Sequence, residues 1–409
     1  MLGPPMDAVA RPSAKVPSGV LFDPQKRAHS LELRDAVRRL AAELGASEMA
    51  LGSRKRSRKP ADRERFRVAV EAIVCNFLVL RLIATDRPLA VPKSSGVMWS
   101  NDRYASPVYG QHFLAALAAM SRPEVGWIEA VATGYKFSSG SAQRSTVRAT
   151  PLLFSSLGVP TCRWCDLRHE APREILILKA PKVKGNSSAP TVGYKETAHT
   201  KALRNRITKL NARLQTAPII IADNVSSLGT DDAGQPIDPT KRSARRIFNN
   251  GKWTEGGRLF DGFWETMPRD ARFRLLRIGT EQCPDGEQIA NVDYAQLFPR
   301  LAYMFEQIAA PDTDLYDAFG DGSCRDGFKR LFNALLFHTG SLSRWPQGTR
   351  PLFPESVRLQ DAIAAITEKH APIAHHFGTG IGFRMMFTES VILLDVMDDL
   401  AKCGITALP

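Results

Sequence analysis

The sequence predicts an α+β protein in which a helical region comes first and a second, compact α+β domain follows. Helical periodicity dominates residues 29–45 and 61–84, whereas short alternating stretches typical of strands begin at residue 126. The chain has 409 residues, 44% of them hydrophobic, which is enough for two or three domains with their own cores. No run of about eighteen apolar residues occurs. We therefore expect no membrane-spanning helix and no membrane partner, and a cytoplasmic protein because no signal-like stretch begins the chain.

The chain carries a formal net charge of +13, and its basic residues are partly clustered in the segment SRKRSRKP at 53–60. Lys and Arg displace counterions condensed on nucleic acid, so this excess of positive charge is suited to a polyanionic partner. The other interpretation is a soluble basic protein without such a partner. The candidate nucleic-acid-binding residues of this cluster are Arg54, Lys55, Arg56 and Arg58.

The composition shifts along the chain predict four segments. Residues 1–22 are rich in proline and are expected to be a disordered tail. Residues 23–223 are expected to form an α+β region that binds nucleic acid, and 224–243 has the composition of a linker. Residues 244–409 then form the second domain.

A helix followed by a basic hairpin is predicted within residues 105–158. The helix covers 110–120, the segment GWIEAVATGYKF at 126–137 alternates like a strand, and SAQRSTVRATPLLF at 141–154 returns as a second strand and a short helix. This order is the outline of a winged helix, which would bind DNA. The alternative is an α+β packing module.

Six cysteines are scattered along the chain, and only the pair in CRWC, Cys162 and Cys165, is closely spaced. A structural zinc site needs about four ligands. His169 is a third candidate, but no second cysteine pair follows at suitable spacing. We therefore favour reduced structural thiols over a zinc site.

The segment NVDYAQLFPRLAYMF at 291–305 places Asp293 at the end of an expected buried strand. Burial of a charge is costly unless something pairs with it. A metal ion and a structural salt bridge are the two candidates.

The helix expected at 324–340 carries Arg325, Lys329, Asn333 and Phe337 at steps of four residues. Residues four positions apart lie along one side of a helix, in a stripe that turns only slightly around the helix axis from one residue to the next. Two cations and an aromatic ring suit a triphosphate and a nucleobase. The alternative is a solvated basic face with Phe337 turned to the core.

The order of several segments resembles the polymerase core of family A DNA polymerases and, more distantly, single-subunit phage-type RNA polymerases. That family has a T-G-R-L segment, an Ile-Pro before an Arg-rich strand, a D-Y-S-Q strand that runs into a helix, and a finger helix R-x3-K-x7-Y-G. The matching segments here are GGRL (256–259), TMP (266–268), RFRLLRIG (272–279), DYAQLFPRL (293–301), Arg325 with Lys329 and Phe337, and FRMMFTESVILLDVMDDLAKCGI (383–405).

The resemblance implies a polymerase palm-like fold for residues 244–409 and a role for each matching residue. Asp293 would be catalytic and hold Mg²⁺ (or Mn²⁺), which bridges the triphosphate and the primer-end hydroxyl. Lys329, also catalytic, and Arg325 would bind the phosphates of a nucleoside triphosphate, and Phe337 would stack near the base. Arg258 would contact the nucleic-acid backbone.

This sequence departs from the family in three ways. Phe337 replaces the tyrosine and His338 the glycine, and the short spacing before the finger helix implies a compact fingers region. The family's second catalytic carboxylate follows the last matching helix, whereas this sequence ends at Pro409. We therefore expect a chain truncated before the last catalytic motif. The acids of the last helix that would have to substitute are Glu389, Asp395, Asp398 and Asp399, although acids on a helix are usually a solvated face.

Three interpretations of function remain. The first is a DNA polymerase-like nucleotidyltransferase, or its inactive relative, that binds DNA rather than RNA in the replication of a plasmid, phage or other mobile element. The second is a non-enzymatic DNA-binding replication or partner protein. The third is a basic α+β protein whose matches arise by chance. The sequence leaves enzymatic activity open and indicates no protein partner.

Overall fold

The computed structural model describes residues 19–136, 142–159, 161–183, 188–223 and 228–409. The chain is a mixed α/β protein whose sheets are small, and it divides into two compact units. Each unit is assembled from separate stretches of the chain. Unit 1 comprises Met1–Glu174, Leu214–Ser243 and Asp261–Gln288, and unit 2 comprises Ile175–Arg213, Ala244–Phe260 and Ile289–Pro409. Within the described ranges, no helix has the length and apolar character needed to cross a membrane.

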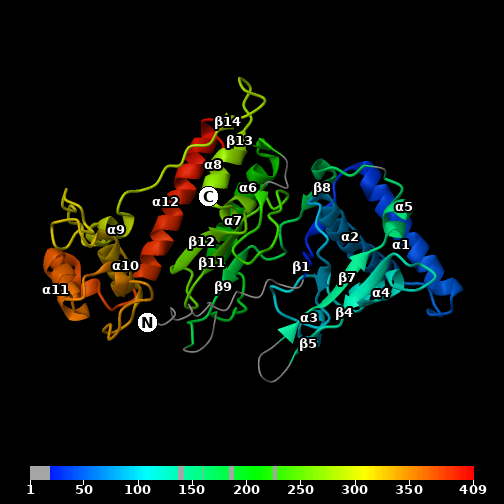
Figure 1. The fold of residues 1–409 in the computed structure, drawn as a ribbon, viewed down its shortest axis with the longest axis horizontal. Helices are drawn as coiled ribbons and strands as arrows, with labels where there is room; N and C mark the ends of the chain where they lie inside the picture. Colours follow the sequence, from blue (N-terminus) through cyan, green and yellow to red (C-terminus); the bar gives the residue numbers. More distant parts are fainter. Residues whose placement is uncertain (1–18, 137–141, 160, 184–187, 224–227) are drawn as a thin grey trace, which may run out of the picture. The chain divides into compact units, whose positions relative to one another are not determined.

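Unit 1 is built on two long helices and a four-stranded sheet (Figure 1). The sheet has the order β1-β3-β7-β4, with β1 parallel to β3 and the other pairs antiparallel. The bounds are β1 (Val20–Leu21), β3 (Leu89–Val91), β4 (Ile128–Ala132), β7 (Ser145–Ala149), α1 (Leu31–Ala50), α2 (Pro60–Leu82), α4 (Gln111–Met120) and α5 (Pro151–Leu157). Every residue from 69 to 80 in α2 is buried, as its all-round apolar pattern predicts. Helix α1 continues past Gly45, where the sequence predicts its end.

The predicted basic hairpin is present in the described residues, since β4 and β7 pair in antiparallel register. A short second pair, β5 (Tyr135–Lys136) with β6 (Ala142–Gln143), extends it. Residues 137–141, part of the predicted return strand, lie outside the described ranges. Helix α4 precedes the hairpin, so the helix-then-hairpin order of the sequence prediction is observed.

The remaining strands of unit 1 form two small sheets. The first pairs β2 (Lys26–Ala28) with β8 (Leu167–His169), and the second has the order β10-β13-β14. The further elements are α3 (Ser95–Met98), η1 (Trp164–Asp166), β10 (Ile219–Ile221), α7 (Phe263–Thr266), α8 (Arg269–Leu275), β13 (Leu276–Ile278) and β14 (Glu287–Gln288).

The segment predicted to be a linker at 224–243 is partly packed, since residues 237–240 are buried whereas residues 229–230 and 232–233 are exposed. Ile237 is buried, and the buried side chains of Asp238 and Lys26 form an ion pair. In its buried part the polar residues take part in internal hydrogen bonds, such as those from the Thr240 N–H and hydroxyl to Asp238.

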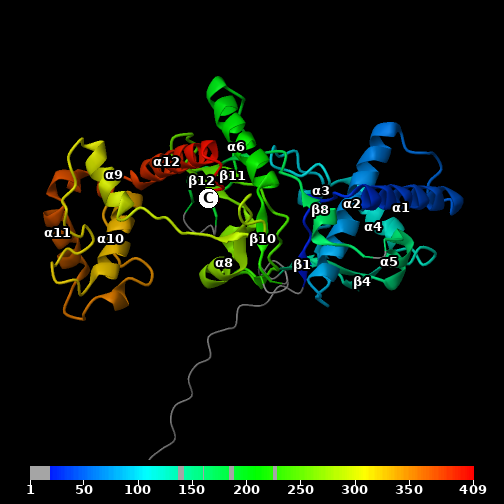
Figure 2. The same ribbon diagram turned by 90° about the horizontal axis from the view of Figure 1, so that it is seen from above.

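Unit 2 combines a three-stranded sheet with a helical part (Figure 2). The sheet has the order β12-β11-β9, in which β11 is antiparallel to β12 and parallel to β9. This pairing explains why residues 175–213 belong with 244–260, whereas the sequence prediction assigns them to separate contiguous domains. The bounds are β9 (Leu176–Leu178), α6 (Ala198–Thr216), β11 (Arg245–Phe248), β12 (Gly256–Phe260), α9 (Leu297–Phe305), α10 (Arg325–Phe337), η3 (Arg350–Leu352), α11 (Leu359–Lys369), η4 (Ala371–His376) and α12 (Gly382–Lys402).

Helix α12 joins the two parts of unit 2, because it packs on β12 and also contacts α9 and α10. Arg246 of β11 is 1% exposed and donates to the Gly257 carbonyl at 2.8 Å and to the Ser390 hydroxyl of α12 at 2.7 Å. Its guanidinium also lies over the rings of Phe248 and Phe387. These contacts anchor the helix to the sheet.

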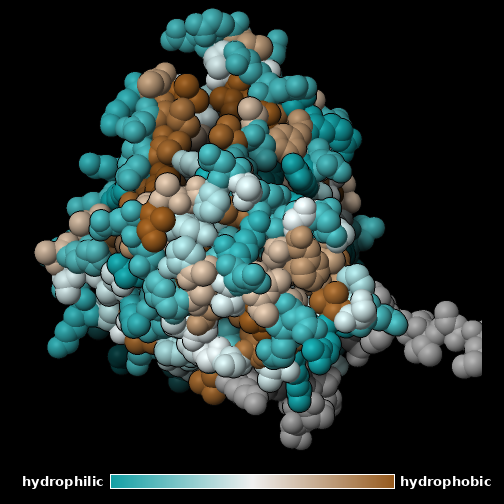
Figure 3. Space-filling model, turned by 90° about the vertical axis from the view of Figure 1, so that its left-hand side faces the viewer, coloured by the Kyte–Doolittle hydropathy of each residue, from teal (hydrophilic) through white to brown (hydrophobic). Residues whose placement is uncertain are grey.

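The helical part of unit 2 has its own core. Phe328, Leu331 and Phe332 of α10 are buried there together with residues of α9 and α11. Figure 3 looks onto this end of the chain and shows apolar side chains at the surface among hydrophilic ones. The large exposed apolar residues of this part include Met304 of α9, Ile308 and Phe319.

The strand predicted to end at Asp293 is absent, and that prediction is wrong. Residues 289–294 belong to no strand, and residues 291–295 are exposed, with Val292 at 93%. The side chain of Val292 points into solvent and not into a core. Because the backbone here is also exposed, water can satisfy its hydrogen-bonding groups and no partner strand is needed. The carboxylate of Asp293 is therefore not desolvated, and the cost that would demand a metal or a salt bridge does not arise.

Candidate nucleotide and nucleic-acid site

Gln296, three residues after Asp293, fixes the start of α9 against the segment before α10. It adopts a left-handed backbone conformation with φ of 56° at the N-cap of α9. Its amide oxygen accepts the Leu315 N–H at 3.0 Å, and its amide nitrogen donates to Asp314 Oδ1 at 3.3 Å. Three residues span at most about 11 Å of extended chain, so Asp293 stays within that distance of this contact.

Asp314 connects this contact to helix α10. Its carboxylate accepts hydrogen bonds from Arg325 Nε and from the Tyr316 N–H, the latter at 2.9 Å. Desolvation raises the pKa of Asp314, but the hydrogen bonds from Arg325 and Tyr316 outweigh it and lower the pKa below its ordinary value. The same bond to Asp314 raises the pKa of Arg325. Both groups therefore stay charged at neutral pH, and the site keeps a fixed ion pair.

The two predicted phosphate-binding cations, Arg325 and Lys329, share one aromatic ring. The Arg325 guanidinium lies 5.7 Å and the Lys329 ammonium 5.8 Å from the centroid of the Tyr316 ring. Tyr316 is 5% exposed, and burial raises its pKa to about 12, so it presents a neutral ring to both. Lys329 is exposed and, among the described residues, pairs with no carboxylate.

Phe337 packs within an aromatic row rather than lying open on the surface. Its ring centroid lies 5.6 Å from that of Phe298 in α9 and 5.2 Å from that of Phe383 in α12, and both contacts are close to edge-to-face. The guanidinium of Arg258 in β12 lies 5.9 Å above the Phe298 ring. The row therefore contains one residue from each of four segments that carry the resemblance.

Arg258, predicted to contact nucleic acid, is engaged by a carboxylate of α12. Its Nε and Nη2 donate to Glu389 Oε2 at 2.8 and 2.6 Å, and both side chains are partly exposed. A nucleic-acid phosphate would have to compete with Glu389 for this guanidinium.

The four acids considered as substitutes for a second catalytic carboxylate all have cationic partners. Glu389 pairs with Arg258, and Asp399 pairs with Lys402 of the same helix at 2.7 Å. The pairs with α6 are Asp395 with Arg206 at 2.6 Å, Asp398 with Arg206 at 3.0 Å, and Asp398 with Arg213 at 2.5 Å. The pairs of Glu389, Asp395 and Asp398 brace α12 against β12 and α6. Each of the four carboxylates is thus engaged by a cation.

The basic loop between α1 and α2 contains residues that make contacts within the protein and residues that are exposed to solvent. Arg58 is 7% exposed in its side chain, pairs with Glu48 at 2.5 Å and stacks 3.6 Å above the Phe66 ring. The Nε of Arg54 donates to the Arg56 carbonyl at 2.9 Å, which folds its side chain back on the loop. Lys55 and Arg56 are exposed. Of the four predicted contacts, these two present their charges to solvent.

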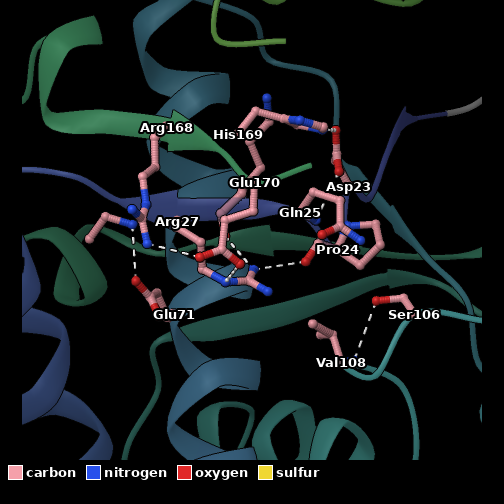
Figure 4. Close-up of polar contacts among 12 residues, drawn as sticks. Asp23, Pro24, Gln25, Arg27, Glu71, Ser106, Val108, Arg168, His169 and Glu170 are labelled. Carbon is pink, nitrogen blue, oxygen red and sulfur yellow. Dashed lines mark hydrogen bonds and ion pairs between the residues drawn. The ribbon is translucent and has the colours of Figure 1, made fainter. Parts of the chain in front are cut away.

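A buried polar cluster in unit 1 involves His169, the residue considered as a ligand beside Cys162 and Cys165 (Figure 4). Its Nε2 lies 3.1 Å from Asp23 Oδ2. Burial lowers the pKa of His169, although Asp23 opposes this shift. Lys241 also approaches Asp23, at 3.4 Å. All six cysteines lie in described ranges and are free of disulfides, and His169 is committed to Asp23.

The sequence analysis missed Asp314 and Tyr316, and it left Gln296 without a role. A signal was present in PDTDLYD, where an aspartate and an aromatic residue stand shortly before the helix that carries the two cations. Local pattern alone does not tell such an aspartate from the several others in this acidic stretch.

No protein-family model matches this chain, and neither a curated protein nor a solved structure matches it.

Proposed function

We propose that this chain is a nucleic-acid-binding protein related to template-dependent nucleotidyltransferases of the DNA polymerase type, serving a plasmid, phage or other mobile element. In this proposal the unit 2 segments 244–260 and 289–409 correspond to the palm and a compact fingers region. Helix α4 with the β4–β7 hairpin acts as a winged-helix-like element for duplex DNA.

The observation that carries the proposal is the meeting of segments that resemble the polymerase core. Arg258, Phe298, Phe337 and Phe383 come from four different segments and touch in one row. The other two matching segments, TMP (266–268) and RFRLLRIG (272–279), belong to unit 1, so the proposal rests on the four segments of unit 2. The Gln296–Asp314–Arg325 connection adds the last residue of DYAQ, Gln296, and the first turn of α10 to this set of contacts.

Each side chain has a definite role in the proposed site. Asp293 offers an exposed carboxylate for Mg²⁺ (or Mn²⁺), which would neutralise charge on the triphosphate. Lys329 binds the phosphates as a point charge, and Arg325 joins it when an incoming phosphate displaces Asp314. Phe337 supports the base-facing surface from within the aromatic row. Phosphoryl transfer depends mainly on such positioning and charge neutralisation.

A second candidate function is a non-enzymatic DNA-binding replication or partner protein that keeps the same scaffold. The ion pairs of Glu389, Asp395, Asp398 and Asp399 favour it, because Asp293 is then without a second carboxylate. Clamping two metal ions about 4 Å apart requires shared carboxylate ligands.

The test is triphosphate binding with and without Mg²⁺, followed by primer extension, on the full chain. Lys329→Ala should weaken triphosphate binding, and Asp293→Asn should remove its dependence on Mg²⁺. Lys209→Ala, an exposed lysine of α6, is the matched control and should bind as the wild type does. Equal binding by all three variants would contradict the proposed site. Binding without extension would select the second candidate, and extension that depends on Asp293 would select the first.

A further inference from the structure

Three potential metal ligands from two distant parts of unit 2 lie together. Glu306 is the C-cap residue of α9, and His375 and His376 end the short helix η4. Glu306 Oε1 lies 3.2 Å from His375 Nε2 and 2.8 Å from His376 Nε2. One ligand atom from each residue can be chosen such that all three lie within 4.8 Å of one another.

The contact between His376 and Glu306 is close but poorly aligned for a hydrogen bond. His376 Nε2 is buried and, among the described residues, has no well-aligned hydrogen-bond partner. A buried polar nitrogen without a partner is costly, and such groups are rare in folded proteins. A metal ion that binds the His376 nitrogen and the Glu306 carboxylate together would give both groups a partner.

The donor set selects a class of metal. Two imidazole nitrogens and one carboxylate oxygen match the ligands that zinc takes in open sites, whereas Mg²⁺ and Ca²⁺ prefer oxygen ligands alone. Bonds of about 2.0–2.1 Å to a tetrahedral zinc place neighbouring ligand atoms roughly 3.3 Å apart. Two of the three separations, 2.8 and 3.2 Å, are close to that value, and the ligand atoms of the two histidines lie within 4.8 Å of each other, so side-chain movements of an ångström or so suffice.

We propose that Glu306, His375 and His376 form a zinc site with a fourth position open to water. The site joins the end of α9 to η4, which are 69 residues apart in the chain. A bound ion therefore cross-links the segment that follows Asp293 to the segment that leads into α12. The proposal does not depend on the nucleotidyltransferase function, because it uses none of the residues assigned to that site.

The experiment is zinc binding by the full chain, measured as metal content after gel filtration and by titration with Zn²⁺ alone. The parent protein carries Cys162→Ser and Cys165→Ser, so that the CRWC pair contributes no zinc. We expect one equivalent of zinc, unaffected by excess Mg²⁺, and a rise in the thermal midpoint on adding Zn²⁺. Co²⁺ in place of zinc should give the visible absorption of a four-coordinate site.

Two variants and a control keep the test decisive. His376→Ala and, as the conservative replacement, Glu306→Gln should each lose the bound zinc and the thermal shift. His199→Ala removes an exposed histidine of α6 outside the cluster and should keep both. Zinc retained by folded Glu306→Gln and folded His376→Ala, or no stoichiometric zinc in the parent, would overturn the proposal.

Discussion

The side chain of Gln296 donates to Asp314 at 3.3 Å, and that same carboxylate holds Arg325. This relationship couples the position of Asp293, three residues before Gln296, to the first turn of α10. In the proposed site both ends must reach one triphosphate. The hydrogen bonds that connect Gln296, Asp314 and Arg325 lie at a partly exposed place. A substitution can therefore remove them without disturbing the hydrophobic core.

Gln296→Ala removes both hydrogen bonds of the Gln296 amide. Each such bond contributes about 1 kcal/mol, and the Asp293 segment loses its attachment. We expect Mg²⁺-dependent triphosphate binding to weaken roughly fivefold or more, since about 1 kcal/mol corresponds to that factor. The measurement is titration with a fluorescent triphosphate. Gln360→Ala, an exposed glutamine of α11, is the control, and an equal loss in both variants would refute the coupling.

Asp314→Asn removes the charge that competes with phosphate for Arg325. On the proposed function, triphosphate binding should strengthen, because Arg325 no longer leaves an ion pair to meet the ligand. The pair is partly exposed, so its loss should cost at most about 1 kcal/mol of folding stability. Asp312→Asn, an exposed neighbour, should change neither property. Weaker binding by Asp314→Asn would mean that Asp314 positions Arg325 rather than restrains it.

The lowered pKa of Asp314 also predicts a pH dependence of stability. A carboxyl group whose folded pKa lies below its unfolded value near 3.9 binds fewer protons in the folded state, so its contribution is present above about pH 4. That contribution falls as the pH drops through the folded pKa. Denaturant unfolding of the wild type and Asp314→Asn should therefore differ most at neutral pH and converge at lower pH. A constant difference from pH 6 to pH 2 would contradict the assignment.

The sequence predicted individual elements better than their pairings. The apolar run of α2, the basic hairpin and the helix of Arg325 and Lys329 are local patterns, and each is observed. The parallel pairing of β9 with β11 joins residues about 70 positions apart, and no local pattern encodes it.

The candidate site was only partly predictable for the same reason. The Arg325–Lys329 spacing can be read from one helix. The role of Asp314 depends on a contact with Gln296 across a loop, which periodicity does not reveal. The predicted strand at Asp293 failed because Val292 beside it suggests burial, while the fold provides no partner strand.

Gly382→Ala tests the aromatic row at the start of α12. A Cβ at this position would lie 2.8 Å from the Phe337 ring, which Phe298 and Phe383 hold in place. We expect a loss of about 1–3 kcal/mol in the free energy of unfolding, as for other overpacked sites. Gly45→Ala is the control, because the helical Gly45 has open space around its Cβ position. That variant should gain about 0.5–1 kcal/mol, and a similar gain for Gly382→Ala would show that Phe337 is free to move.

Substitutions in the basic loop between α1 and α2 should affect either DNA binding or folding stability, depending on the residue. Lys55 and Arg56 are exposed, so Lys55→Ala with Arg56→Ala should weaken DNA binding and reduce the slope of log K against log salt by about 1–2, at unchanged stability. Arg58→Ala should instead destabilise the fold, since it leaves Glu48 buried without its cation and removes the stack on Phe66. Its salt slope should stay near that of the wild type wherever the protein remains folded. A slope that falls in Arg58→Ala but not in the double variant would place the phosphate contact on Arg58 and reverse this division of roles.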